Sequence, residues 1–111
     1  MVADRPLVSI GLPVFNGARF LAKAVEALLD QTYQNIELVI SDNASTDATG
    51  DICTHYASLD GRIRYSRLSE NVGAVLNHNR VCSLATGKYF MFASHDDLVL
   101  PSYVEKCVEC L

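Results

Sequence analysis

The chain has 111 residues, a length that suits one domain built around one hydrophobic core. Apolar residues make up 50% of it, so a globular fold is expected, and the formal net charge of −4 argues against a nucleic-acid backbone as the main partner. No apolar run reaches the length of a membrane span, and the first residues lack the features of a signal peptide. We therefore expect a cytoplasmic protein, with peripheral attachment to the inner face of the membrane as a compatible variant.

The first half of the chain alternates apolar runs with polar loops and helical patterns. Residues 7–12 predict a strand, which residues 13–17 interrupt because proline, asparagine and glycine favour turns. Apolar residues at helical spacing then predict a helix over residues 17–31. Residues 36–40 predict a second, buried strand, and the polar loop 41–47 after it is rich in residues that cap helices. A less regular helix follows, marked by Ile52, Cys53 and Tyr56.

The second half repeats this pattern twice. Residues 62–68 predict a third strand, whose weaker apolar character places it at an edge of the sheet. Asn71-Val72-Gly73 opens a third helix, and Gly87 ends it as a C-cap glycine. The aromatic run 89–93 predicts a fourth strand, buried on both faces. Pro101 marks the start of the last helix, whose expected core positions are Val104, Cys107, Val108 and Leu111.

Four strands that alternate with four helices predict a single domain, residues 1–111, with a three-layer α/β/α sandwich and a mostly parallel sheet. Numbered along the chain, the strands should lie in the order 3-2-1-4, because strands and helices alternate and the crossovers should be right-handed. The order then reverses beside strand one, where a ligand crevice forms. Every polar loop with ligand-competent side chains follows a strand. These loops should therefore gather at one edge of the sheet.

The cysteines do not form a recognisable metal framework. Cys107 and Cys110 are three residues apart in a helix-like tail, but a zinc site needs a second close pair, which Cys53 and Cys82 do not provide. We expect buried free thiols in a reducing compartment.

Two adjacent carboxylates, Asp96 and Asp97, follow the fourth strand. Two neighbouring negative charges repel one another, and a divalent cation with oxygen ligands relieves that repulsion. One hypothesis is therefore a metal site at this edge of the sheet. The alternative is a pair of loop aspartates that caps the helix starting at Pro101.

Five segments in order resemble the opening of inverting family 2 glycosyltransferases, and together they cover essentially the whole chain. They are residues 8–16 (VSIGLPVFN), residues 31–47 (QTYQNIELVISDNASTD), Asn71-Val72-Gly73 with Asn79-Arg80, residues 85–89 (ATGKY) and Asp96-Asp97. The resemblance implies a GT-A type, Rossmann-like fold whose first half binds a nucleotide-sugar, with a UDP-sugar as the expected donor.

The resemblance also implies roles for particular residues. The loop of Pro13, Val14, Phe15 and Asn16 would pack along the base, with Phe15 closest to it. The loop of Asp42 and Asn43 would hydrogen-bond the base, although many relatives have a second Asp where this chain has Asn43. Of the acidic pair, Asp96 would face the ribose, and Asp97 would bind the Mn²⁺ or Mg²⁺ that clamps the diphosphate.

Several of these residues have a simpler structural interpretation. Phe15 could be a core aromatic, Asp42 could only cap a helix, and for Asp47 a structural cap is the favoured role. Arg80 could reach the diphosphate, because a guanidinium suits phosphate, or lie on a solvated helix face. His55 and His78 are expected on the surface, and His95 is expected to be a satisfied loop residue rather than a ligand.

Two other function classes remain open at this point. A sugar-phosphate nucleotidylyltransferase would use a related sheet, but residues 12–17 lack the glycine-rich, Arg-containing loop typical of those enzymes. A non-catalytic α/β module could use the acidic cluster for Mg²⁺ or a nucleotide. No residue here matches the general base of the family, so we expect a nucleotide-sugar-binding part of a longer glycosyltransferase, with an unknown acceptor.

Overall fold

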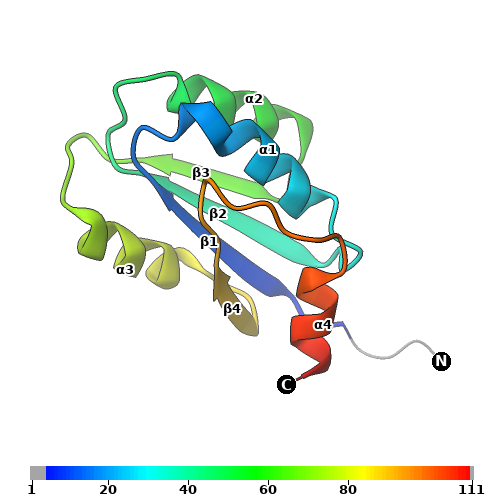
Figure 1. The fold of residues 1–111 in the computed structure, drawn as a ribbon. Helices are drawn as coiled ribbons and strands as arrows, with labels where there is room; N and C mark the ends of the chain where they lie inside the picture. The colour runs from blue at the N-terminus through cyan, green and yellow to red at the C-terminus, as the bar shows by residue number, and fades with distance from the viewer. Residues whose placement is uncertain (1–4, 111) are drawn as a thin grey trace.

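A computed structural model describes residues 5–110. The strands are β1 (Val8–Val14), β2 (Ile36–Asp42), β3 (Ile63–Arg67) and β4 (Tyr89–Phe92). The helices are α1 (Ala18–Leu29), α2 (Thr49–Leu59), α3 (Ala74–Leu84) and α4 (Tyr103–Glu109). All strand pairings are parallel and the sheet order is β3-β2-β1-β4, so the predicted topology is confirmed (Figure 1).

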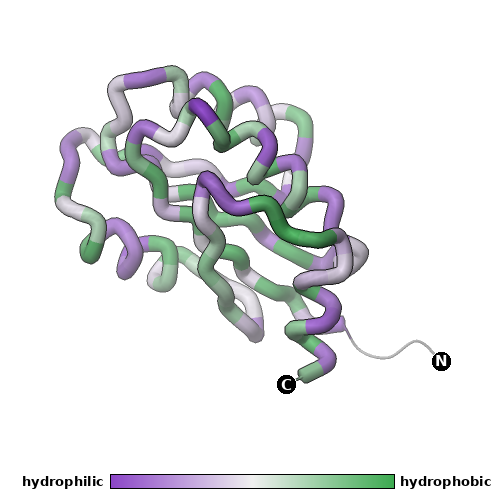
Figure 2. The backbone as a smooth tube through the Cα atoms, viewed as in Figure 1, coloured by the Kyte–Doolittle hydropathy of each residue, from purple (hydrophilic) through white to green (hydrophobic). Residues whose placement is uncertain are grey.

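Helices cover both faces of the sheet. Helices α1 and α2 pack together over one face, and α3 packs against β1 and β2 on the other (Figure 1). The alternation of side chains along β1 explains this division. Ile10, Leu12 and Val14 join Leu21 and other residues of α1 in the main core. Figure 2 shows hydrophobic residues along the central strands and also along the segment between β4 and α4.

Gly11 faces the other side of β1. A Cβ at this position would lie 2.8 Å from Val81 of α3 and 2.6 Å from the ring of Phe90. A glycine here therefore allows α3 to pack closely on the strand. The close packing of α3 matters for function, because the amino end of this helix forms one wall of the pocket described below.

Helix α4 is anchored beside the end of α1 by one buried side chain. Gln31 donates from its amide nitrogen to the carbonyl of Leu100, and its amide oxygen accepts from the backbone N–H of Val104. Val104 is fully buried, as expected, while Leu111 lies outside the described residues. None of the helices within residues 5–110 has the length and apolar character needed to cross a lipid bilayer.

A buried carboxylate joins four elements at the amino end of the sheet. Glu37 of β2 accepts from Ser9 Oγ at 2.5 Å, from the backbone N–H of Thr86 at 2.6 Å and from Arg64 at 3.1 Å. Burial disfavours the charged form, but these hydrogen bonds outweigh it and lower the pKa of Glu37 to about 2. The turn that leads into β4 is thereby held against β1, β2 and β3.

Three expectations are wrong in detail. Gly87 is not a C-cap, because α3 ends at Leu84; Gly87 instead donates its N–H to Ser9 Oγ, and a Cβ there would lie 2.7 Å from the carbonyl oxygen of Leu7. Strand β4 is not buried on both faces, since Phe92 is 50% exposed. The cysteines are not all buried: Cys53 is, while Cys82 and Cys110 are exposed.

Candidate functional site

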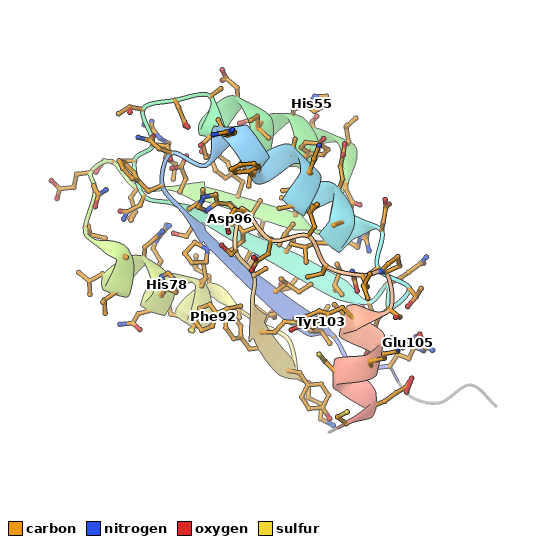
Figure 3. All side chains as sticks on the ribbon, in the orientation of Figure 1. His55, His78, Phe92, Asp96, Tyr103 and Glu105 are labelled. Atoms are coloured by element: carbon orange, nitrogen blue, oxygen red, sulfur yellow. The ribbon has the colours of Figure 1, made fainter. Side chains whose placement is uncertain are left out.

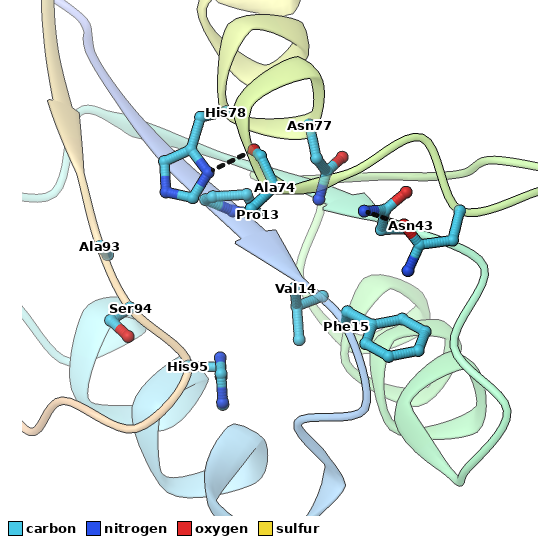
Figure 4. A pocket seen from close by; sticks show the side chains of 11 residues that line it. Pro13, Val14, Phe15, Asn43, Ala74, Asn77, His78, Ala93, Ser94 and His95 are labelled. Atoms are coloured by element: carbon cyan, nitrogen blue, oxygen red, sulfur yellow. Dashed lines mark hydrogen bonds between the residues drawn. The ribbon is translucent and has the colours of Figure 1, made fainter.

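A pocket of about 320 Å³ opens at the carboxyl ends of β1 and β2, between the amino end of α3 and the loop after β4 (Figure 4). This is the place where open parallel sheets bind ligands, at the point where the strand order reverses. Its lining residues are Pro13, Val14, Phe15, Asn43, Asn71, Ala74, Asn77, His78, Ala93, Ser94 and His95.

Phe15 forms one wall of the pocket, with 45% of the residue exposed. The interpretation as a core aromatic is therefore wrong. The loop that carries Phe15 is held in place by the loop after β2. Asn16, at φ 51°, donates its N–H to Ser45 Oγ, and its side-chain oxygen accepts from the N–H of Thr46. Asn16 itself turns away from the pocket and does not line it.

Asp47 secures the same loop from the other side, which confirms its expected structural role. Its carboxylate accepts from the backbone N–H groups of Ala18 and Thr49. These bonds outweigh the effect of burial and lower the pKa of Asp47 below its usual range. The first backbone N–H of α1 thus donates to a carboxylate from the loop that follows β2, where a negative charge is favourable.

Asn43 also lines the pocket and is almost completely buried. Its amide nitrogen donates to Asn71 Oδ1 and to the carbonyl of Gly73, and its amide oxygen accepts from the N–H of Val72 (Figure 4). The end of β2 is thereby tied to the loop that precedes α3. The predicted placement of Asn43 in the site fits this geometry.

Asp42 lies on the other side of β2 and does not line the pocket. It is fully buried, and it accepts from Tyr65 Oη at 2.7 Å and from the N–H of Ser45 at 2.9 Å. Burial and the bond to Asp42 raise the pKa of Tyr65. Burial and the same carboxylate raise the pKa of Cys53 to about 12. The expected contact between Asp42 and a base therefore has no support from this geometry.

Arg80 is also directed away from the pocket. Its guanidinium donates to Ser41 Oγ and Ser66 Oγ, which lie on neighbouring strands. Ser41 in turn donates to Asn77 Oδ1 at 2.6 Å, and Asn77 donates back to the Ser41 carbonyl at 3.0 Å. Arg80 thus fits neither sequence-based interpretation, since it joins α3 to the sheet. Asn77, a buried pocket residue, was not singled out from the sequence.

The loop after β4 forms the remaining wall. Ser94 and His95 line the pocket, and the ring of His95 lies so close to Gly17 that a Cβ there would approach it to 2.7 Å. Asp96, labelled in Figure 3, and Asp97 follow His95 directly and are exposed. Asp97 does not line this pocket but a smaller cavity with Leu28 and Tyr103. Ser94 Oγ donates to Asp96 Oδ1, and this bond, together with the nearby His95, lowers the pKa of Asp96.

The acidic pair suits a cation that takes most of its ligands from elsewhere. Within residues 5–110 no cluster of three or more His, Cys, Asp or Glu side chains is positioned to hold a metal ion. Two exposed carboxylates can supply one or two of the six oxygen ligands that Mn²⁺ or Mg²⁺ prefers. A bound diphosphate and water would have to supply the others.

His55 and His78 are both exposed, as expected from the sequence, and His55 lies on α2 away from the pocket (Figure 3). His78 lines the pocket, where its Nδ1 bonds to the carbonyl of Ala74 and its ring packs against Phe92. Helical spacing could have indicated that His78 lies beside Ala74, because residues four apart in a helix share a face.

Comparisons with known proteins agree on one family. The model of "Glycosyl transferase family 2" matches residues 9–111. Glycosyltransferase GlyG of Streptococcus pneumoniae is 36% identical over 99 residues, which are 89% of this chain and 33% of GlyG. The putative teichuronic acid biosynthesis glycosyltransferase TuaG of Bacillus subtilis is 36% identical over 105 residues, which are 95% of this chain and 42% of TuaG. The chain thus spans well under half the length of these relatives.

Solved structures show the same fold at lower identity. A mannosyltransferase from Pyrobaculum calidifontis, in complex with GDP-Man and Mn²⁺, superposes with a TM-score of 0.87 at 23% identity over 96% of this chain and 32% of that one. S. aureus TarS 1-349 in complex with UDP-GlcNAc gives 0.84 at 23% identity over 92% of this chain and 30% of that one. The sheet and its helices are those of GT-A glycosyltransferases.

These matches cover the same segments that carried the resemblance in the sequence, and they do not favour a nucleotidylyltransferase. The family model alone extends over all but the first eight residues. The chain belongs to glycosyl transferase family 2.

Proposed function

We propose that this chain binds the nucleotide-sugar donor of a glycosyltransferase. The observation that carries the proposal is the pocket itself: the exposed ring of Phe15 lines it, and so do Ser94 and His95, which the exposed carboxylates Asp96 and Asp97 follow directly. A nucleoside diphosphate needs both features, because its base stacks on aromatic rings and its diphosphate requires charge neutralisation.

In this arrangement the base lies against Phe15, between the loop of Pro13 and Val14 and the wall that contains Asn43. The ribose and diphosphate extend towards Ser94 and Asp96. A uridine or guanosine diphosphate sugar is the donor class we favour, since related folds have been solved with UDP-GlcNAc and with GDP-Man. The transfer would proceed with inversion to an acceptor of unknown chemistry.

Asp96 and Asp97 would hold Mn²⁺ or Mg²⁺ in the loop that follows β4. When bound, such a cation supplies a positive charge that stabilises the departing nucleoside diphosphate. The chain's own part is to present two carboxylates on a loop that Ser94 orders through its bond to Asp96. Without a cation, the two carboxylates would repel each other and the diphosphate. Binding of the cation should therefore favour binding of the nucleotide, and binding of the nucleotide should favour binding of the cation.

The general base and the acceptor-binding surface are not assigned to residues of this chain. GlyG and TuaG are both longer than the segment they share with it. We place the missing functions in such additional sequence, and we place the reaction in the cytoplasm or at the inner face of its membrane. In this view the 111 residues form one nucleotide-sugar-binding domain.

The test is a calorimetric titration of the chain with UDP, with Mn²⁺ present or removed by EDTA. The affinity should fall at least about tenfold in EDTA, because the diphosphate would then meet the two carboxylates directly. Asp97→Asn should remove this dependence on Mn²⁺ while the thermal stability of the free protein stays unchanged, because Asp97 is exposed.

Asp51→Asn on the outer surface of α2 is the matched control and should behave as the wild type. Equal affinity for UDP in Mn²⁺ and in EDTA would contradict the metal clamp. Absence of UDP and GDP binding under both conditions would contradict the proposed function as a whole and favour a module that acts without a nucleotide.

A further inference from the structure

The carboxyl end of helix α4 carries two cysteines, Cys107 and Cys110, which have no part in the nucleotide pocket. Cys107 is partly buried and Cys110 is exposed, and both thiols are free. The N–H of Cys110 donates to the carbonyl of Cys107 at 3.3 Å. A bond between residues three apart is typical of the tight 3₁₀ turn that ends many helices, in which side chains three apart lie above one another. The two thiols therefore lie on the same side of this turn.

Both cysteines also line one open pocket of about 420 Å³. Leu100 and Tyr103 give this pocket an apolar surface, and Lys106 adds a positive charge that favours the approach of an anionic reagent. None of the described residues that line it also lines the nucleotide pocket, so the two sites are separate. Because the two thiols face the same space, a reagent that reaches one of them can reach the other.

The spacing of the two residues suits a disulfide bond. Residues three apart in an α-helix or a 3₁₀ turn have Cα atoms roughly 5–6 Å apart. Disulfide bonds join residues whose Cα atoms are about 4.4–6.8 Å apart. The bond can therefore form within the last turn, while the first turn of α4 stays attached to Gln31, which accepts from the N–H of Val104.

We propose that Cys107 and Cys110 form a reversible dithiol site, which a small disulfide such as oxidised glutathione converts to a disulfide bond across the last turn of α4. The thiolate of the more exposed Cys110 attacks the small disulfide, forms a mixed disulfide and releases one glutathione. The thiolate of Cys107 then attacks the sulfur of Cys110 and releases the second glutathione. The two protein thiols lose two electrons and two protons, and the two glutathione products gain them.

The other two cysteines of the chain provide internal controls. Cys53 is buried, so a reagent does not reach it in the folded protein. Cys82 is exposed on α3, and its nearest cysteine in the sequence is Cys107, 25 residues away. Cys82 should therefore take up glutathione as a mixed disulfide and keep it, because the displacing thiol that the pair provides is missing there.

The test equilibrates the chain with mixtures of reduced and oxidised glutathione, stops the exchange with acid and locates the products by peptide mass spectrometry. Cys107 and Cys110 should lose two hydrogen atoms and carry no glutathione, while Cys82 carries one. The equilibrium constant for the disulfide should be at least about tenfold larger in the folded chain than in the chain unfolded in urea, because the helix holds the two thiols together.

Two variants separate the roles of the thiols. Cys107→Ser should leave glutathione bound to Cys110, because the thiol that displaces it has been removed. Cys82→Ser removes an exposed thiol from a different helix and is the matched control. It should leave the equilibrium constant of the pair unchanged.

Two outcomes would overturn the proposal. Glutathione that stays on Cys107 or Cys110 of the folded wild type, without a disulfide between them, would show that the two thiols do not meet. An equilibrium constant no larger in the folded than in the unfolded chain would show that the fold does not bring them together. Either result would leave the binding of UDP, and with it the proposed function, unaffected.

Discussion

Asp42 and Asn43 are neighbours in the sequence but serve opposite sides of the sheet. Successive side chains of a strand point to opposite faces, so only one of the pair can reach the pocket. Asn43 does, while Asp42 points into the core beside Cys53 and Tyr65. Resemblance to the family identified the loop but did not distinguish the two residues. The alternation along β2 could have distinguished them once the pocket side of the sheet was known.

Asp42→Ala should therefore destabilise the fold rather than remove a ligand contact. The change leaves Tyr65 Oη and the N–H of Ser45 without their buried acceptor. The free energy of unfolding, measured in urea, should fall by about 2–4 kcal/mol. Asp42→Asn should cost less, because the amide oxygen can still accept from Ser45 and the amide nitrogen can donate to the hydroxyl of Tyr65.

Unchanged stability together with lost UDP affinity would instead indicate that Asp42 is part of the binding site. A variant Asp42→Ala with the stability of the wild type and no affinity for UDP would show that the carboxylate contacts the nucleotide directly. The two measurements together separate a structural carboxylate from a ligand.

Phe15 should contribute to nucleotide binding and little to stability. Its ring is 45% exposed and lines the pocket, so Phe15→Ala removes a stacking surface without opening a core cavity. We expect UDP affinity to fall by about 1–3 kcal/mol, the range for loss of one base–aromatic stack. Phe20→Ala is the control, because Phe20 is 46% exposed on α1 outside the pocket. Equal losses of UDP affinity in both variants would contradict a contact between Phe15 and the base.

At the scale of elements, the position of β4 depends on the amino end of the sheet. The turn before this strand is held by Thr86 and Gly87, which bond to Glu37 and Ser9. Four residues of strand then lead to the loop that carries Ser94 and the acidic pair. The segment 85–89, which carried part of the family resemblance, thus has a structural explanation in this chain.

The Glu37 carboxylate should make stability depend on pH in acid. Its pKa is about 2 in the folded protein against an ordinary value of 4.5, so the unfolded chain binds more protons between these values. The stabilisation is present above about pH 4.5 and is lost as the pH falls towards 2, with a total of about 3 kcal/mol.

Glu37→Gln should be less stable than the wild type at pH 7 and should lose less stability between pH 5 and pH 2. Urea unfolding at several pH values measures both effects. Glu70→Gln, at an exposed position, is the control. Parallel pH profiles of the wild type and Glu37→Gln would contradict the assignment.

Elements were predicted well where local pattern decides them and less well where burial depends on distant neighbours. The helix stripe of α1 and the apolar run of β2 are local features, and both elements form where expected. The exposure of β4 is different. Its aromatic composition resembles that of a central strand, but its pairing is with β1 alone within residues 5–110, so Phe90 and Phe92 remain partly exposed.

For the whole molecule, alternation of strands and helices was enough to predict the sheet order and the edge at which the loops meet. It was not enough to predict the contacts between those loops. The link between Asn43 and Asn71 joins residues 28 positions apart, and it depends on the backbone turn at Gly73. Such contacts arise only once the loops are placed in space, which is why the sequence did not reveal the link through Asn71.

The central claim is that a nucleoside diphosphate and its cation occupy the edge where these loops meet. Backbone amide NMR spectra of the chain with UDP and Mg²⁺, then with trace Mn²⁺, test this location most directly. Shifts on adding UDP should concentrate at Val14, Phe15, Asn43, Asn71 and His78, and paramagnetic broadening by Mn²⁺ should centre on Asp96 and Asp97. Shifts confined to another surface, or broadening that spares the acidic pair, would contradict the account.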